Sequence, residues 1–142
     1  ATLTFNNQGR FECRWVTLKS CSSKCIWTRG LAETIHCPVA HGEGNFITAS
    51  KEILDYLNEN DQVAFQYVDT NGEIARGTYP VNPNGSQLDI AGICNPEGNV
   101  LGLMPHPENH IYNYQHPRRS RGESWGSGLP LFRNGVGFCS QI

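Results

Sequence analysis

The segment GLMPHPE (residues 102–108) contains the residues best placed to do chemistry, His106 and Glu108. It follows apolar residues at 100–103, which predict a strand, and open α/β sheets bind ligands at the carboxyl ends of their strands. Each proline favours extended backbone for the residue before it, and residues two apart in an extended chain point the same way. Glu108 could therefore orient the imidazole of His106, as in a nucleophile–histidine–acid triad. A proline-stiffened surface turn is the alternative explanation of this spacing.

A second candidate is the glycine-containing segment AHGEG at residues 40–44. Its two glycines permit positive φ angles and let the backbone approach a ligand closely. Successive backbone N–H groups can then form a concave site for an anion such as a carboxylate. A β-turn in which the glycines serve only the geometry is the alternative.

The elements that must position these segments are mostly strands. In residues 10–19 Phe11, Cys13 and Trp15 alternate with Glu12 and Arg14, which is a strand pattern. Strands are expected at 10–19, 33–40, 62–68, 74–80, 88–94 and 99–104, a hairpin turn at 69–72, further turns at 82–86 and 95–98, and helices at 51–60, with Ser50 as the N-cap, and 129–138.

Six strands with two helices give too little helix to cover both faces of a parallel sheet. This composition of elements predicts part of an α/β sheet whose other half is missing. The sequence starts without a methionine, and a strand is expected already at residue 10. The chain is therefore expected to begin partway through a larger unit.

Composition narrows the class of protein. The 142 residues suit one domain, 38% are apolar, and the net charge is only −2. This charge argues against a general nucleic-acid coat or a polybasic membrane anchor, and no apolar run is long enough to predict a membrane span. The six cysteines are widely spaced, so we interpret them as reduced thiols of a cytoplasmic protein.

The cysteines also suggest an alternative, a structural zinc site. Cys21, Cys25, His36 and Cys37 could supply four ligands, with Cys13 as a fifth. Structural zinc usually takes tighter Cys-x2-Cys turns, and adjacent residues of a strand face opposite sides. We therefore expect no metal at these residues.

Five segments carry a resemblance to a known family. They are GRFECRWVTLK (9–19), PVAHGEGNF (38–46), NPNGS (82–86), IAGICNPEGNVLGLMPHPE (90–108) and QHPRRSRGESWGSGLPLFRNGV (115–136). In this order along the chain they resemble the glutaminase part of phosphoribosylformylglycinamidine synthase, a class I (triad) glutamine amidotransferase of purine biosynthesis.

The resemblance implies the C-terminal part of a class I glutamine amidotransferase-like (flavodoxin-like) α/β fold, with an open mixed sheet rich in strands. A cysteine thiolate would attack the side-chain amide of glutamine. His106 would match the catalytic histidine and Glu108 the carboxylate that orients it, while His41, Gly42 and Glu43 would match the segment that grips glutamine. The ammonia would pass to an ATP-dependent synthetase partner, which would itself use the ATP and magnesium, so no cofactor is expected here.

The chain also departs from the family pattern. The nucleophile elbow G-x-C-x-G would precede residue 1, so residues 1–142 are expected to be the C-terminal portion of one domain and inactive alone. Cys94, in GICNP, imitates the elbow, but Pro96 lacks the N–H and the freedom of φ that a sharp elbow needs. Asn109 stands where the family usually has an arginine after HPE.

A non-catalytic binding or regulatory domain on the same scaffold remains the other functional alternative. Intact His106 and Glu108 argue against it. The only basic cluster could meet a partner protein or a phosphate, or form a solvated surface; it comprises Arg118, Arg119, Arg121 and Arg133.

Overall fold

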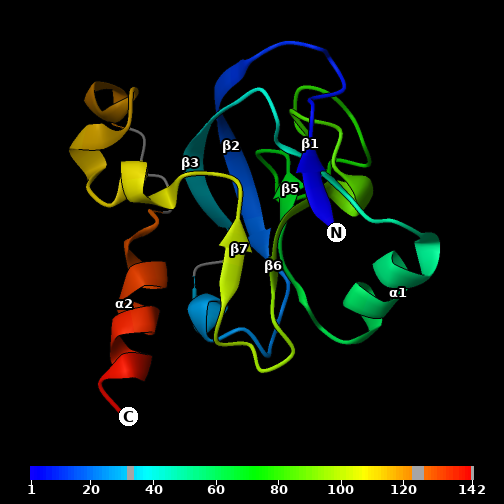
Figure 1. Ribbon diagram of the computed structural model, residues 1–142. Helices are drawn as coiled ribbons and strands as arrows, with labels where there is room; N and C mark the ends of the chain where they lie inside the picture. Colours follow the sequence, from blue (N-terminus) through cyan, green and yellow to red (C-terminus); the bar gives the residue numbers. More distant parts are fainter. Residues whose placement is uncertain (32–33, 123–126, 142) are drawn as a thin grey trace.

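A five-stranded antiparallel sheet occupies the centre of the protein (Figure 1). The computed structural model describes residues 1–31, 34–122 and 127–141. The strand order is β3-β2-β5-β6-β7, and the strands are β2 (Glu12–Ser20), β3 (Thr34–His41), β5 (Val63–Val68), β6 (Ile90–Cys94) and β7 (Leu101–Leu103). A separate ribbon pairs β1 (Thr2–Thr4) with β4 (Asn45–Ile47). The expected α/β fold rich in strands is confirmed.

Both predicted helices are present, as α1 (Lys51–Glu59) and α2 (Leu129–Cys139). Ser50 occupies the N-cap position of α1 with extended backbone, although its hydroxyl makes no capping hydrogen bond. Short 3-10 helices lie at η1 (Ile26–Thr28), η2 (Gln87–Asp89), η3 (Pro107–His110), η4 (Asn113–Gln115) and η5 (Arg119–Arg121). None of the helices in the described residues has the length and apolar character needed to cross a membrane.

The strand predicted at 10–19 forms, but its buried side at the start is the polar one. Glu12 is only 2% exposed, whereas Phe11 is 64% exposed. Burial of this carboxylate is possible because Arg10 and Arg14 both form ion pairs with it. The apolar alternation alone does not reveal which face of β2 meets the interior.

The strand predicted at 74–80 is wrong. Ile74 forms a single antiparallel bridge with Val68, closing the predicted hairpin turn. Arg76 (φ 52°) and Gly77 (φ 71°) then adopt left-handed backbone, which cannot continue a strand. The chain therefore leaves the sheet after this one bridge.

Other boundaries differ by a few residues. Leu88 and Asp89 have φ angles of 50° and 56°, so β6 begins at Ile90 and not at residue 88. Glu33, the first residue of the predicted strand 33–40, lies outside the described residues, as do residues 123–126 of the tail motif. The ribbon of β1 and β4 was not predicted, because three-residue strands carry too little alternation to detect.

The core lies mainly between the sheet and the α2 side of the molecule. Phe65 and Tyr67 of β5 are fully buried in it. A smaller cluster joins Phe46, Leu57, Val63 and Ile90 beneath α1. Burial of these side chains supplies the main stabilisation of the fold.

The sheet curls so that the chain leaving one edge strand reaches the other. After β7 the segment crosses toward β3 (Figure 1), and the backbone N–H of His106 donates to the carbonyl oxygen of Pro38 at 2.9 Å. We call this contact the seam. It brings the two sequence-predicted segments, around residues 41 and 106, to the same region of the fold.

Candidate active site

His106 and Glu108 form the contact expected from their spacing. Nδ1 of His106 lies 2.8 Å from Oε1 of Glu108. The local reason differs from the expectation: His106 has φ −109° and ψ 77°, and η3 begins at the next residue, so a helical turn, not an extended strand, returns the carboxylate to the ring. Their catalytic role remains a prediction.

The orientation of this pair leaves one ring nitrogen available. An ionised carboxylate only accepts hydrogen bonds, so the proton of neutral His106 lies on Nδ1 and Nε2 carries the lone pair. The His106 side chain is 39% exposed and that of Glu108 53% exposed. An external group could therefore reach Nε2, which is the arrangement that a general base requires.

A cluster of aromatic rings packs between η3 and β3. His110 is buried and its Nδ1 hydrogen-bonds to the carbonyl oxygen of His36. The Trp15 ring packs against the rings of His36, His110 and His116, at centroid distances of 5.3, 5.2 and 4.6 Å. No sequence pattern indicates that these four residues meet.

The loop at residues 41–44 is held by Asn6, which sequence reasoning missed. Asn6 is 3% exposed, and its Nδ2 donates to the carbonyl oxygens of His41 (2.8 Å) and Arg10 (2.9 Å). Its Oδ1 accepts from the N–H of Gly44 at 3.0 Å, and its own N–H donates to Gly42. Nothing in the run FNNQG marks this particular asparagine for such a role.

The glycines of this loop serve close packing and not positive φ, which corrects the expectation. Gly42 and Gly44 both lie outside the left-handed region. A Cβ on Gly44 would overlap the buried ring of His41, whereas a Cβ on Gly42 would meet nothing within 4 Å. Since the N–H of Gly44 is bound to Asn6, it is not available to the expected anion site. Glu43 is exposed.

The NPNGS segment (82–86) is more than a surface turn, because its polar side chains are buried beneath this loop. Asn84 accepts from the hydroxyl of Ser86 at 2.7 Å and donates to the hydroxyl of Tyr67 at 3.0 Å. The hydroxyl of Ser86 also accepts from the N–H of Phe46 in β4. These hydrogen bonds satisfy buried polar groups and fix the strand that follows the 41–44 loop.

A buried ion pair lies beside the same loop. Glu12 faces His41 across β2 and β3. Burial alone would raise the pKa of Glu12, but hydrogen bonds from Arg10 and Arg14 outweigh it and hold that pKa below its usual value. Tyr79 accepts from both guanidinium groups through its hydroxyl. The ionised carboxylate of Glu12, at the start of β2, therefore lies beside the end of β3.

Neither Cys37 nor Cys94 is suited to act as the nucleophile. Burial raises the pKa of Cys37 strongly, and the negative charge of Glu108 adds to this effect. Burial, followed by the neighbouring Cys25, also raises the pKa of Cys94. Thiolate is the reactive form, so both environments disfavour reaction. This agrees with the interpretation of Cys94 as a non-catalytic cysteine.

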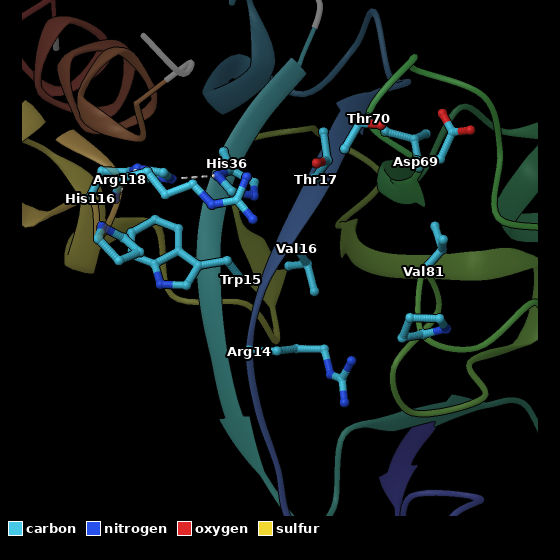
Figure 2. Close-up of a pocket in the computed structure, with 13 residues that line it drawn as sticks. Arg14, Trp15, Val16, Thr17, His36, Asp69, Thr70, Val81, His116 and Arg118 are labelled. Atoms are coloured by element: carbon cyan, nitrogen blue, oxygen red, sulfur yellow. Dashed lines mark hydrogen bonds between the residues drawn. The ribbon is translucent and has the colours of Figure 1, made fainter. Parts of the chain in front are cut away.

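A hollow of about 450 Å³ lies away from His106 and Glu108, beside β2 (Figure 2). β2 pairs with β5 only from Thr17 to Ser20, so the hollow adjoins the unpaired part of its edge. The hollow is lined on one side by His36, His116 and Arg118, and on the other by Asp69, Thr70 and Val81. Neither His106 nor the 41–44 loop lines it, so it is not the predicted glutamine site.

A second hollow has a volume of about 360 Å³. It is lined mainly by apolar residues and backbone of β1, β4, β6 and β7, and it includes Met104.

Asn109, the departure from the family pattern, is exposed in η3.

The alternative zinc site finds no geometric counterpart. Among residues 1–31, 34–122 and 127–141, no three or more His, Cys, Asp or Glu side chains are grouped to hold a metal ion. All six cysteines are free. The four arginines of the basic cluster are exposed, and Arg118 lines the larger hollow.

Comparison with known proteins establishes the family. Residues 1–139 match the family described as the CobB/CobQ-like glutamine amidotransferase domain, so the chain belongs to this family. The phosphoribosylformylglycinamidine synthase subunit PurQ of Treponema denticola is 50% identical over 141 residues, covering 97% of this chain and 52% of that protein. The PurQ subunit of Archaeoglobus fulgidus is 44% identical over 144 residues, covering 99% and 51%. The resemblance drawn from the sequence motifs is thereby confirmed.

The solved structure of PurLQS from Thermotoga maritima is similar in fold. The match has a TM-score of 0.68 at 26% identity and covers 97% of this chain and 52% of that chain. The chain spans about half the length of the curated relatives cited here.

Proposed function

We propose that residues 1–142 form the C-terminal portion of one glutamine amidotransferase domain and supply the histidine and glutamate of a Cys–His–Glu triad. The observation that carries this proposal is the 2.8 Å contact between His106 and Glu108, within the motif that carries the family resemblance. The cysteine would come from an N-terminal half of the domain; this chain covers 52% of the Treponema denticola subunit.

In the proposed reaction a cysteine thiolate attacks the side-chain amide carbon of glutamine. Protonated His106 gives its Nε2 proton to the departing nitrogen, so that ammonia leaves and a thioester remains. Neutral His106 then removes a proton from water, which attacks the thioester and releases glutamate and the thiolate. Glu108 keeps the proton on Nδ1 and stabilises the imidazolium that is present before ammonia leaves and forms again when water is deprotonated.

The 41–44 loop is the proposed glutamine-binding segment. Gly42 and Glu43 would grip the α-amino and α-carboxylate groups, and His41 would complete this contact. Support comes from the position of the loop at the end of β3, the strand to which the seam ties His106. The open space around Gly42 leaves its backbone accessible to a ligand.

The ammonia would pass to an ATP-dependent synthetase partner of purine biosynthesis. The PurLQS complex of Thermotoga maritima, to which this chain is similar, supports the assignment of a partner subunit. ATP and magnesium would bind to that partner. We further propose a cytoplasmic location with no nucleic-acid or membrane partner, since all six cysteines are free thiols, as is usual in a reducing compartment.

The test is a chimera in which this chain replaces the matched segment of the Treponema denticola subunit. Release of glutamate from glutamine is measured for the chimera, for its His106→Ala and Glu108→Gln variants, and for Glu59→Gln as an exposed control of the same chemistry. We expect the two site variants to lose about 10²- to 10⁴-fold in rate, and Glu59→Gln to keep full activity.

Three results would contradict the proposal. An active chimera that tolerates His106→Ala would remove His106 from the reaction. Glutamate release by the 142-residue chain alone would show that the nucleophile lies within it. An inactive chimera that still binds glutamine would favour the non-catalytic binding domain.

A further inference from the structure

The side-chain amide of Asn6 has a fixed orientation. Its Nδ2 faces two carbonyl oxygens, those of His41 and Arg10, which can only accept hydrogen bonds. Its Oδ1 therefore faces the N–H of Gly44 and, at 3.0 Å, Nδ1 of His41. The reverse orientation would set N–H against N–H and oxygen against oxygen, so the hydrogen bonds themselves select the first.

This orientation determines where His41 carries its proton. The amide oxygen of Asn6 can only accept, so Nδ1 of His41 must donate. In the neutral ring Nε2 is then a bare acceptor. Nε2 is buried and has no hydrogen-bond partner among the described residues, while His41 as a whole is 7% exposed. A buried acceptor without a partner is costly unless another group completes it.

The surroundings of His41 both raise and lower its pKa. Burial lowers the pKa of His41, and the neighbouring His106 lowers it further. A hydrogen bond to its own backbone and the negative charge of Glu12, which faces it from β2, act to raise it. Burial is the largest of these effects, so the pKa of His41 lies below its ordinary value.

His41 and His106 thus differ in one respect that decides their chemistry. Both present Nδ1 to a side-chain oxygen, but His106 faces a carboxylate and His41 faces a neutral amide. A carboxylate balances the charge of an imidazolium, whereas an amide oxygen supplies no such charge. The partner of His106 therefore favours a protonated ring, whereas the partner of His41 does not.

We propose that Asn6 is a positioning residue that fixes His41 as the neutral Nδ1–H form with a bare, buried Nε2, so that His41 does not carry protons in the proposed reaction. The proposal rests on the proposed function, because His41 belongs to the segment assigned to glutamine. It adds the protonation form of His41 and the residue that enforces it.

The first test reads the tautomer directly, by proton–nitrogen correlation NMR of the histidine rings in the unaltered 142-residue chain at neutral pH. A His41→Gln spectrum identifies the His41 signals. We expect a protonated Nδ1 and a bare Nε2 for His41. A proton on Nε2 would overturn the proposal. This readout needs no catalysis, so it stands apart from failure of the chimera.

The second test replaces the amide oxygen by a carboxylate. In Asn6→Asp the new charge beside Nδ1 should raise the pKa of His41 by about 1 to 3 units in an NMR titration. Asn7→Asp is the matched control, because the exposed Asn7 side chain contacts Asn45 and not His41. A shift of equal size in both variants would contradict the specific role of Asn6, whereas a shift confined to Asn6→Asp supports it.

Discussion

Gly44→Ala should destabilise the protein because the new methyl group has no room. Its Cβ would lie 2.5 Å from Nε2 of His41 and still nearer to Cε1 and Nδ1. Unstrained contacts of this kind lie at about 3.5–4.0 Å, so the ring would have to retreat by about 1 Å. The ring is buried and Asn6 holds its Nδ1, so it cannot do this freely. Such overpacking typically costs about 1–3 kcal/mol.

Gly42→Ala, two residues away in the same loop, is the control. A Cβ there meets nothing within 4 Å and φ lies outside the left-handed region, so this variant should be unchanged or more stable by about 0.4–1 kcal/mol. Urea unfolding followed by tryptophan fluorescence measures both. With an m-value of about 2 kcal/mol/M, the two midpoints should differ by about 1 M urea. Equal midpoints would refute the argument that packing against His41 requires glycine at position 44.

Two further predictions concern stability elsewhere. In α2, a Cβ on Gly135 would overlap the ring of Trp27, so Gly135→Ala should lower stability by about 1–3 kcal/mol, while Gly137→Ala, with nothing within 4 Å, should raise it by about 0.5–1 kcal/mol. Thermal unfolding followed by circular dichroism compares them, and equal Tm values would contradict this packing. The lowered pKa of Glu12 means that the stability it contributes is complete above its ordinary pKa of 4.5 and is lost as pH falls through the lowered value. Urea unfolding at a series of pH values should therefore show a weaker acid-induced loss in Glu12→Gln, and parallel curves would argue against the buried ion pair.

The sequence predicted the elements that are long and periodic. The strand at 10–19 and the helix at 51–60 were found within two residues of their observed ends, since alternation and helical spacing are strong over such lengths. The pairing of His106 with Glu108 was also predictable, because two residues so close in sequence can meet in more than one backbone conformation.

Features that depend on distant partners could not be predicted. Glu12 is buried only because its two arginine partners and Tyr79 converge on it, and Tyr79 comes from a distant segment. Asn6 gains its role from a loop that is far away in sequence. The strand predicted at 74–80 does not form because Arg76 adopts left-handed backbone. No residue type in this segment indicates that conformation.

The seam makes the proposed chemistry depend on the complete sheet. Its hydrogen bond joins His106 to Pro38, which lie on opposite borders of the curled sheet and far apart along the chain. Contacts between such distant residues carry a high loop-closure cost, so we expect this one to form after the intervening strands have paired. The amide of His106 is therefore a natural reporter for hydrogen exchange. Its protection measures whether the whole sheet, and not merely one turn, has reached the shape in which an imidazole and its carboxylate can work.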